Sequence, residues 1–504
     1  MVSFGKTSLL LRLAIRNPYN IEIKAAMRLK APLPDKFKQF GEWYDLVSEK
    51  AELADVRYGV KGFVVFRPNL MHIIREIYEA LERHLIASGH RAMLFPLLIP
   101  YKNLLVEKEH VKGFENQVFS VEKAGGEELE ERLFIRPTSE TAIYPMYALW
   151  IRSYRDLPFK GFQSCAVYRH ETKATRPLFR GREFLWVESH DVFAKKEEAE
   201  AQLKEDMEIT RKTFEEFGLP FLPIEREPFD RFPGAERSLA YDVILPDRQV
   251  LQSATTHLLG RRFTAPFGVS FLSAEGQKVV PESTCFGPGV SRIAALIVSV
   301  HGDEYGLVLP FKAAIVQVVV VPIRNEPALV DYAGVVAEKL AQAGYKVRVD
   351  DGTETAGEKF YRWEMLGTPV RIEIGPREAE SKVLTVTRRD QRKRENVAED
   401  ALVPRLASLE KEILADLSKK AWAWLDSNIQ DASSKEDVLS KARGGGGFIK
   451  FTFCGGEGCA RDIKAQTGGY EVRGRRVDVD EKHAESCTWC GTKGIELAYL
   501  AKAY

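Results

Sequence analysis

The chain has 504 residues, of which 45% are hydrophobic and 29% charged, and its 73 basic and 72 acidic residues leave a formal net charge of +1. This composition excludes a disordered, collagen-like or disulfide-scaffold protein, and the length predicts about three domains. The longest apolar runs fall far short of the roughly 18 residues that a membrane span needs, so no membrane partner is expected. The balanced charge neither requires nor excludes nucleic acid, because local basic patches decide that question.

Residues 1–34 form a basic N-terminal extension with six basic residues and the single acid Glu22. An Arg-rich, acid-poor segment of this kind is typical of a mitochondrial presequence. The alternative, which we favour, is an unstructured extension or an upstream start with Met27 as the working start. Cys165 and Cys285 stand alone in apolar surroundings, which suits a reducing compartment. A cytoplasmic location is therefore expected, with a mitochondrial location as the alternative.

Residues 35–308 read as long strands with helices segregated between them, which indicates an α+β domain with an antiparallel sheet. Helical periodicity and cap residues predict helices at 41–52, 70–88, 137–152, 194–217 and 291–300, with Pro137 in the first turn of the third. Apolar runs predict strands at 92–99, 161–170, 182–192, 241–245, 250–256 and 267–272.

Beyond residue 309 the pattern changes to alternating strands and helices. Strands at 315–321, 345–349, 370–374 and 383–387 enclose helices at 327–343 and 356–366, which predicts a small α/β domain over 309–403 with parallel pairing. A basic run at 388–394 either contacts phosphate or is a solvated charge run. The remaining residues, 404–504, form a C-terminal domain that is helical to about residue 428.

The stretch at 167–187 concentrates groups that bind a nucleoside triphosphate. Arg169 and Glu171 are two residues apart, so on a strand they point to the same face. Three further arginines follow before residue 183, and Phe184 and Trp186 again share a face. Guanidinium groups pair with phosphate oxygens, a carboxylate accepts the adenine amino group, and an aromatic ring covers the base.

A second motif, Gly287-Pro-Gly-Val-Ser-Arg292, stands where an apolar helix begins. Two glycines let the backbone approach a ligand closely, and an arginine at the helix start suits an anion. Tight turns before helices are common, so this motif gains weight only when it is paired with the first.

Together with the Pro-bearing strand at Leu94-Phe-Pro96, these motifs resemble motifs 2, 3 and 1 of the class II aminoacyl-tRNA synthetases. Further segments resemble prolyl-tRNA synthetase of the archaeal and eukaryotic type over about residues 43–504. They are Arg136-Pro-Thr-Ser-Glu140, Thr175-Arg-Pro-Leu, Arg182-Glu-Phe-Leu-Trp186, Phe232-Pro-Gly-Ala, Gly302-Asp and Gly306-Leu-Val-Leu-Pro310. The resemblance implies an antiparallel-sheet catalytic domain, an anticodon-binding α/β domain and a zinc-bearing C-terminal α+β domain.

The activity implied is activation of proline by ATP to prolyl-adenylate and pyrophosphate, followed by transfer of proline to the 3′ end of tRNA(Pro). Mg²⁺ would accompany ATP, and a homodimer would form through the motif 1 region. The implied proline site consists of Thr138, Glu140, Arg169, Trp186, Phe232 and His257. The implied ATP site consists of Arg169, Glu171, Arg180, Phe184, Gln252, Thr255, Ser291 and Arg292. Arg169 and Arg292 are implied to be catalytic, Gln252 to help seat Mg²⁺, and Lys359 and Glu364 to read anticodon bases.

The chain also departs from the usual pattern, which makes it a divergent member. Its motif 3 resembles the longer bacterial form, Gly260-Arg-Arg-Phe replaces a usual G-Q-x-F, and Leu258 stands where Asn or His is common. Bacterial-type relatives carry an editing domain between motifs 2 and 3. The interval from Arg169 to Arg292 leaves no room for one, so no cis-editing is expected.

The tail pairs Cys454 with Cys459 and Cys487 with Cys490, which is the two-knuckle layout of a zinc site with four thiolate ligands. Such a shell leaves no open position for water, so a structural zinc ion is expected. The last residue, Tyr504, matches the family's ending, in which the terminal carboxylate reaches toward the catalytic site. A frayed terminus is the alternative.

Two other functions are alternatives to a proline–tRNA ligase. A regulatory protein that kept the fold and lost catalysis is disfavoured because Thr138, Glu140, Arg169, Glu171 and Arg292 are all present. A threonine ligase would place zinc in the amino-acid pocket, and the sequence predicts no set of Cys and His ligands there.

Overall fold

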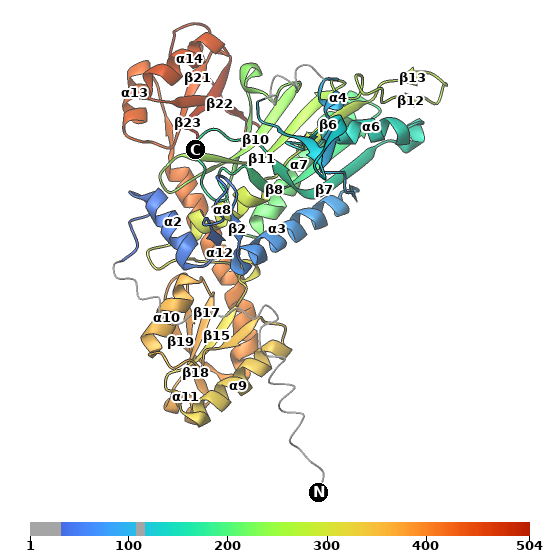
Figure 1. Ribbon diagram of the computed structural model, residues 1–504. Helices are drawn as coiled ribbons and strands as arrows, with labels where there is room; N and C mark the ends of the chain where they lie inside the picture. The colour runs from blue at the N-terminus through green and yellow to red at the C-terminus, as the bar shows by residue number, and fades with distance from the viewer. Residues whose placement is uncertain (1–31, 107–115) are drawn as a thin grey trace.

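One long sheet runs through the upper half of the molecule and joins strands from two of the predicted domains (Figure 1). The computed structural model describes residues 32–106 and 116–504. The predicted extension at 1–34 therefore lies almost wholly outside the described residues, and the targeting role stays a prediction.

The catalytic half of this sheet is antiparallel, as predicted, except that its edge strand β3 runs parallel to β7. Its order is β3, β7, β8, β14, β11, β10, β9. The bounds are β3 (Arg91–Ala92), β7 (Phe159–Tyr168), β8 (Glu183–Phe193), β14 (Glu282–Phe286), β11 (Val250–Gly260), β10 (Arg237–Ile244) and β9 (Leu222–Glu225).

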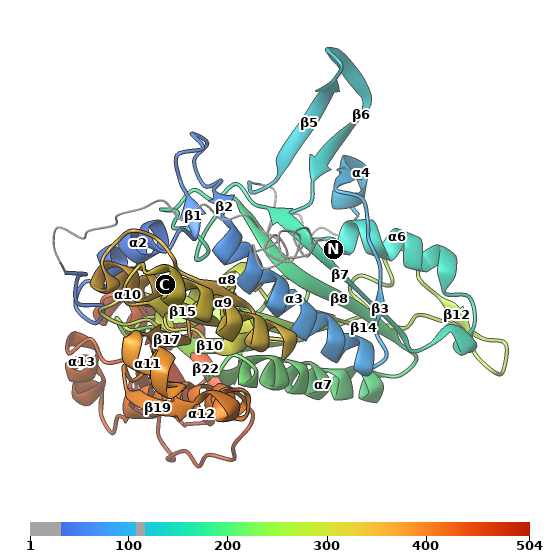
Figure 2. The ribbon, with the colours of Figure 1, turned by 90° about the horizontal axis from the view of Figure 1, so that it is seen from below.

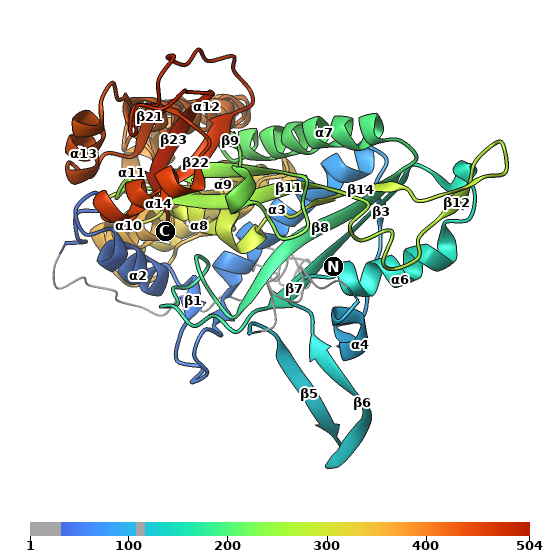
Figure 3. The same cartoon turned by 90° about the horizontal axis from the view of Figure 1, so that it is seen from above.

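Three helices pack against this sheet and against one another: α3 (Pro68–Ala87), α7 (Lys196–Glu215) and α8 (Val290–His301) (Figure 3). The residues 293–298 of α8 are all buried, because this helix is apolar around its circumference. Pro68 stands at the start of α3, where its missing N–H costs nothing. The short helix α2 (Phe40–Lys50) adds Trp43 and Tyr44 to the same core. Among the described residues, no helix combines the length and the apolar character that crossing a membrane requires.

Three elements of this domain differ from the prediction. Of the strand predicted at 267–272, only Phe271–Leu272 (β12) is a strand, and it lies outside the main sheet. The run at 92–99 is not one strand, because the chain leaves β3 to join a separate small sheet at β4 (Leu98–Pro100). The helix predicted at 137–152 is α6 (Glu140–Trp150), with Ser139 as its N-cap. Pro137 lies outside it, where its carbonyl accepts a hydrogen bond from Arg169.

Smaller elements surround the core. Strand β4 pairs with the hairpin of β5 (Phe119–Ala124) and β6 (Glu127–Ile135), which projects away from the body (Figure 2). A second hairpin, β1 (Ala54–Asp55) and β2 (Val65–Phe66), lies beside the cavity described below. The remaining short elements are α4 (Tyr101–Leu104), β12 (Phe271–Leu272) and β13 (Lys278–Val279).

The second domain is a five-stranded sheet in the order β16, β15, β17, β18, β19. Only the first three strands are parallel; β18 and β19 pair antiparallel, so the prediction of parallel pairing was wrong for that edge. The bounds are β15 (Val318–Pro322), β16 (Val347–Val349), β17 (Val370–Ile374), β18 (Val383–Arg388), β19 (Arg394–Ala398), α9 (Pro327–Gln342), α10 (Ala356–Met365) and α11 (Pro376–Ser381).

The basic run at 388–394 is the turn between β18 and β19, and acidic side chains neutralise its arginines. Arg388 pairs with Asp390 and Asp416 at 2.7 and 2.6 Å, while Arg389 pairs with Asp303 of the catalytic domain at 2.6 Å. Both arginines are buried. The geometry therefore gives them a structural role, unlike either role considered from the sequence.

Helix α12 (Leu402–Ser427) connects the lower and upper parts of the molecule (Figure 1). Its first leucines belong to the core of the five-stranded sheet, so the predicted boundary between residues 403 and 404 falls within this helix. The C-terminal domain that follows contains β20 (Ile429–Asp431), β21 (Phe448–Phe453), β22 (Tyr470–Arg476), β23 (Glu496–Lys502), α13 (Lys435–Arg443) and α14 (Glu457–Gln466).

The sheet of the C-terminal domain is continuous with the catalytic sheet through β22 and β9. Arg475 pairs with Glu225 and Arg476 with Ile224. Gly474 makes this approach possible: its φ is +110°, and a Cβ there would lie 1.8 Å from the carbonyl oxygen of Glu225. The C-terminal domain is thereby fixed beside the catalytic sheet.

Candidate active site

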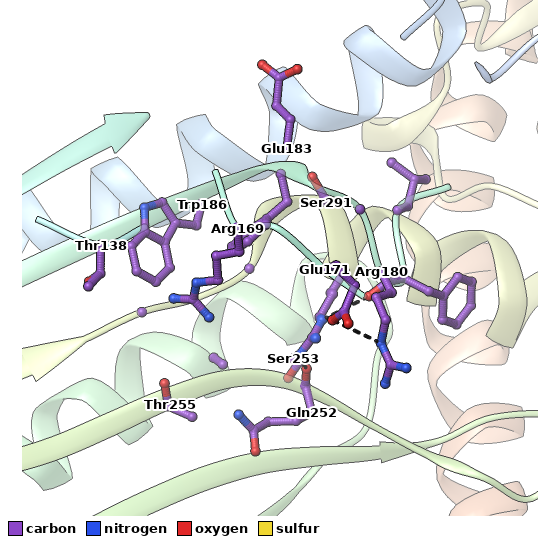
Figure 4. A pocket seen from close by; sticks show the side chains of 18 of the residues that line it. Thr138, Arg169, Glu171, Arg180, Glu183, Trp186, Gln252, Ser253, Thr255 and Ser291 are labelled. Atoms are coloured by element: carbon purple, nitrogen blue, oxygen red, sulfur yellow. Dashed lines mark hydrogen bonds and ion pairs between the residues drawn. The ribbon is translucent and has the colours of Figure 1, made fainter. Parts of the chain in front are cut away.

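A cavity of about 870 Å³ opens over the catalytic sheet, and every residue predicted to bind proline or ATP lines it. Figure 4 shows Arg169 beside Trp186, facing Gln252 and Thr255 on the opposite strand. The predicted residues that it brings together are Thr138, Glu140, Arg169, Glu171, Arg180, Phe184, Trp186, Phe232, Gln252, Thr255, His257, Ser291 and Arg292.

Arg169 reaches this cavity by a different local structure from the one predicted. Strand β7 ends at Tyr168, and Arg169 and Glu171 do not lie on it together. The backbone turns because the amide of His170 donates to Gln117 and that of Glu171 donates to Arg169. Both side chains nevertheless line the cavity, with Glu171 3.8 Å from the guanidinium of Arg180.

The guanidinium of Arg169 is held in place from two sides. Its Nε donates to the carbonyl of Pro137 at 3.0 Å, and its Cζ lies 5.2 and 5.6 Å from the ring centroids of Phe184 and Trp186. Burial lowers the pKa of Arg169 from its ordinary value, and the carboxylate of Glu140 opposes that shift. A cation so placed attracts an anion that enters the cavity.

Thr138 and Glu140 form a small acidic corner at the start of α6. The Thr138 hydroxyl donates to the Glu140 carboxylate at 2.6 Å, and both residues are buried. A carboxylate in this position stabilises a bound ammonium group, because such charge-assisted hydrogen bonds are about twice as strong as neutral ones.

Two residues on β8, Glu188 and His190, line the same cavity although they were not predicted. They continue the face of Phe184 and Trp186 in steps of two, so the alternation along the strand could have identified them. Burial raises the pKa of Glu188, but hydrogen bonds from His190, Ser139 and Gln163 outweigh it and hold that pKa below its usual range.

An aromatic wall closes another side of the cavity. The rings of Phe232 and His257 stack with centroids 4.8 Å apart. Burial lowers the pKa of His257 to about 3, so the ring is neutral and its Nδ1 hydrogen-bonds Ser238 at 2.8 Å. A neutral wall suits an apolar ring such as that of proline.

Arg292 enters from the start of α8 and is anchored to two carbonyls, those of Gln252 at 2.9 Å and Phe179 at 3.3 Å. Burial, with Arg169 and Arg180 nearby, lowers the pKa of Arg292 to about 10. Arg292 stays charged near neutrality, and three clustered cations attract a polyphosphate.

A further buried network, also missed from the sequence, supports Gln252. Arg226 donates to the Gln252 side-chain oxygen at 2.8 Å and lies 3.2 Å from Asp242. Asp242 also accepts from Arg473 on β22 of the C-terminal domain. Arg226 and Arg473 both line the cavity. No local pattern places residue 473 beside residue 242, because only the joining of β22 to β9 does so.

The C-terminal residue lies at the edge of the cavity rather than fraying into solvent. Arg180 donates to the terminal carboxyl oxygen of Tyr504 at 2.8 Å, and Arg176 bonds its hydroxyl. The Tyr504 ring packs on Phe179 with centroids 4.6 Å apart. Of the two alternatives left open by the sequence, the structure favours a terminus that reaches the site.

The prediction that the amino-acid pocket contains no set of Cys and His ligands was wrong. Glu140, His190 and Cys285 lie together in the cavity with metal-ligating atoms within 4.8 Å of one another. The sequence predicted no set of Cys and His ligands there, because these residues are far apart in the chain. The amino-acid pocket therefore offers no argument from missing ligands against a threonine ligase.

The four cysteines of the tail meet as predicted. All four Sγ atoms lie within 4.8 Å of one another, with Cys459 and Cys487 4.0 Å apart and Cys454 and Cys490 3.7 Å apart. Zn–S bonds of about 2.3 Å place tetrahedral ligands about 3.8 Å from each other. The geometry is thus compatible with a zinc ion held by four thiolates.

The predicted anticodon readers lie far from this cavity on α10, and both are buried. Lys359 donates to the carbonyl of Asp350 at 3.0 Å, and Glu364 pairs with Arg371 at 3.3 Å. Either side chain would have to leave these partners to meet a base. Their assignment stays a prediction.

Three regions of the chain match known domains. Residues 119–301 match the tRNA synthetase class II core domain (G, H, P, S and T), residues 317–409 an anticodon binding domain, and residues 436–504 the C-terminal domain of prolyl-tRNA synthetase.

Whole-chain comparisons agree with these matches. A proline–tRNA ligase of Thermofilum pendens is 47% identical over 93% of this chain and 98% of its own length, and one of Methanopyrus kandleri is 41% identical over 92% and 96%. The prolyl-tRNA synthetase of Giardia lamblia, solved with prolyl-adenylate, superimposes with a TM-score of 0.91 at 34% identity over 94% of this chain and 100% of that one. The chain therefore belongs to the prolyl-tRNA synthetase family of class II aminoacyl-tRNA synthetases, in its archaeal and eukaryotic type.

Proposed function

We propose that this protein ligates proline to tRNA(Pro): it activates proline with ATP, releases pyrophosphate, and transfers the prolyl group to the 3′ end of the tRNA. The observation that carries the proposal is the acidic corner of Thr138 and Glu140 beside Arg169 in one cavity. An amino acid needs a carboxylate for its ammonium group and a cation for its carboxylate, and these residues provide both.

In the first step the proline carboxylate attacks the α-phosphorus of ATP, and pyrophosphate leaves. The substrate carboxylate is already ionised at neutral pH, so this step needs no general base. Positioning and charge neutralisation are what the protein contributes. Arg169 would neutralise the α-phosphate and the proline carboxylate, and Arg292 would neutralise the departing pyrophosphate.

The substrates would lie between the two walls of the cavity. Trp186, Phe232 and His257 would enclose the proline ring, while Phe184 would cover adenine and Glu171 accept its amino group. Arg180, Thr255 and Ser291 would complete the ATP site. Ser291 already accepts a hydrogen bond from the Leu185 amide at 2.9 Å, which ties the two motifs together.

Metal ions have two separate roles in this proposal. Mg²⁺ bound to ATP would offset phosphate charge, with Gln252 as a ligand, although its oxygen also accepts a hydrogen bond from Arg226. Zinc held by Cys454, Cys459, Cys487 and Cys490 would stabilise the C-terminal domain, since four protein ligands leave no open coordination position.

In the second step the adenylate passes proline to the terminal ribose of tRNA. The anticodon would bind the domain of β15–β19, which matches an anticodon binding domain. The interval between Arg169 and Arg292 is occupied by β8, α7, β9, β10, β11 and β14, which all belong to the catalytic core. This supports a ligase without a cis-editing domain.

A homodimer through the motif 1 region is also part of the proposal. Exposed apolar side chains gather there: Leu94 is 78%, Leu149 57% and Trp150 44% exposed, and the Phe95 and Trp150 rings lie 6.1 Å apart. An exposed patch of this kind marks an interface. Leu94→Glu should shift the mass measured by analytical ultracentrifugation to that of a monomer, whereas Val335→Glu on α9 should not.

One experiment tests the central proposal. ATP–pyrophosphate exchange should be supported strongly by proline among the standard amino acids, and the protein should then charge a tRNA(Pro) transcript. Exchange supported by threonine instead of proline would overturn the proposal. So would a lack of exchange with every amino acid, in protein whose circular dichroism spectrum shows that it is folded.

A further inference from the structure

The amino-acid end of the cavity contains three side chains that do not share a segment of the chain: Glu140 at the start of α6, His190 on β8 and Cys285 on β14. One ligand atom of each lies within 4.8 Å of the other two. In the sheet, Cys285 stands directly opposite His190 on one side and His257 on the other. Side chains opposite each other on adjacent strands point to the same face, so the fold itself brings thiol and imidazole together.

The imidazole of His190 is prepared to act as a ligand. Its Nε2 hydrogen-bonds the Glu188 carboxylate at 3.2 Å, which fixes the orientation of the ring. Its Nδ1 is buried and has no hydrogen-bond partner among the described residues. Metal-ligating histidines are commonly oriented by a carboxylate on the other ring nitrogen in this way.

The donor set selects the class of ion. Thiolate and imidazole favour soft or borderline ions such as Zn²⁺ and Cd²⁺, whereas Mg²⁺ prefers oxygen ligands. Ligands of a tetrahedral zinc ion lie about 3.3–3.8 Å apart. The distances between the three atoms therefore need to shorten by at most about 1.5 Å, a displacement within reach of side-chain rotation.

A second cluster shows why access matters. His90, Asp191 and Asp206 also bring metal-ligating atoms within 4.8 Å, but none of the three lines the cavity. All members of the Glu140–His190–Cys285 set line it, so an ion would enter by the route that the substrate uses.

We propose that this set is a binding site for Zn²⁺ or Cd²⁺ that competes with the amino acid. The inference rests on the proposed function, because Glu140 is the carboxylate assigned to the substrate ammonium. An ion bound by Glu140, His190 and Cys285 occupies the position of that ammonium group and excludes it. Both binding partners are cations that need the same carboxylate.

Direct binding can be measured on the full chain with its four C-terminal cysteines already loaded with zinc. Added Cd²⁺ should produce a thiolate-to-metal charge-transfer absorption, and proline should remove it. Cys285→Ser should weaken Cd²⁺ binding at least about tenfold. Even the substitution of a residue that only hydrogen-bonds a metal ligand lowers metal affinity by about 10–100-fold. Cys165→Ser is the matched control, because Cys165 is equally buried but stands outside the set. Cys285→Ala gives the same test if the serine variant does not fold.

The kinetic consequence is a second readout. In ATP–pyrophosphate exchange with free Zn²⁺ set by a metal buffer, inhibition should be competitive with proline, and Cys285→Ser should raise the inhibition constant at least about tenfold. Equal inhibition of wild type and Cys285→Ser would overturn the site, as would a Cd²⁺ absorption that proline leaves unchanged. A Cys285-dependent, proline-sensitive absorption in protein that fails to activate proline would leave this site standing and overturn only the proposed function.

Discussion

Arg473 of the C-terminal domain donates two hydrogen bonds to Asp242 of the catalytic domain, with Nε and Nη2 at 2.8 and 3.0 Å from its carboxylate oxygens. Asp242 is fully buried, and it also lies 3.2 Å from Arg226. Burial raises the pKa of Asp242, but the two arginines outweigh it and hold that pKa below its usual range. Through this ion pair the C-terminal domain contacts the wall of the ATP site, in addition to the contact that Tyr504 makes with Arg180.

Arg473→Gln should therefore raise the KM for ATP, by about tenfold, because Asp242 and Arg226 lose the partner that orients them toward Gln252. Steady-state exchange kinetics with varied ATP measure this. Arg475→Gln is the control, since Arg475 lies on the same strand as Arg473, pairs with Glu225 of β9 and is half exposed.

Breaking a buried pair can also destabilise a protein by about 3–5 kcal/mol. A double-mutant cycle with Asp242→Asn separates the two effects, because a positioning role predicts that the KM changes of the two single variants are not additive. An unchanged KM for ATP in folded Arg473→Gln would contradict the role.

Arg169→Ala should reduce proline-dependent exchange by about 10²–10³, as expected when one group that stabilises charge in a transition state is removed. The loss should appear in kcat, since the charge at the α-phosphate increases during the reaction. Arg324→Ala, an exposed arginine of the second domain, should leave exchange unchanged. Activity near that of wild type would overturn the assignment of motif 2.

The sequence predicted the residues of the site better than the contacts between distant segments that hold those residues in place. Every residue predicted to bind proline or ATP lines one cavity, because the motifs are local, although Arg169 and Glu171 lie on a turn after β7 and not on one strand face. Glu188 and His190 were missed although the alternation from Phe184 and Trp186 leads directly to them.

Other features depend on pairing between distant segments, which local patterns do not encode. The joining of β22 to β9 brings Arg473 to Asp242, and the register of β14 with β8 brings Cys285 to His190. The antiparallel strand β19 was missed because it begins at Arg394, the last residue of the basic run, whose guanidinium lies 3.3 Å from the carboxylate of Glu373 on β17.

Glu140→Gln should weaken proline binding and leave ATP binding nearly unchanged. The substitution removes the negative charge beside the substrate ammonium but keeps the shape and one acceptor for the Thr138 hydroxyl. The KM for proline, measured by exchange, should rise by at least about tenfold, the equivalent of about 1.4 kcal/mol. Equal losses for proline and ATP would show that Glu140 supports the start of α6 instead.

Deletion of Tyr504 should weaken ATP use, because Arg180 loses the carboxylate that its Nη2 meets at 2.8 Å. A hydrogen bond to a charged group contributes about 1.5–3 kcal/mol, so an effect of about tenfold or more on kcat/KM for ATP is expected. Tyr504→Phe keeps the terminal carboxylate and loses only the hydroxyl contact with Arg176. It should have the smaller effect, and the reverse order would contradict this role of the terminus.

The purified protein should contain one zinc ion per chain at the four C-terminal cysteines, and Cys487→Ser should lower the stability of that domain. Metal binding and folding are coupled in such sites, so loss of a ligand removes folding free energy. A loss of 2–3 kcal/mol shifts the melting temperature of a domain of this size by about 10 °C or more. Scanning calorimetry and elemental analysis measure both quantities, with Cys165→Ser as a control that should retain its zinc.

Adenylate formation should fall less than stability in Cys487→Ser, because the cysteines lie outside the cavity and act on it only through Arg473 and Tyr504. Removal of zinc from the wild-type protein by a chelator should likewise lower the stability of the C-terminal domain more than the rate of adenylate formation. A fall in exchange at temperatures where the C-terminal domain is still folded would assign the metal to the chemistry, contrary to this expectation. Protein produced with ample zinc that contains none would overturn the site itself.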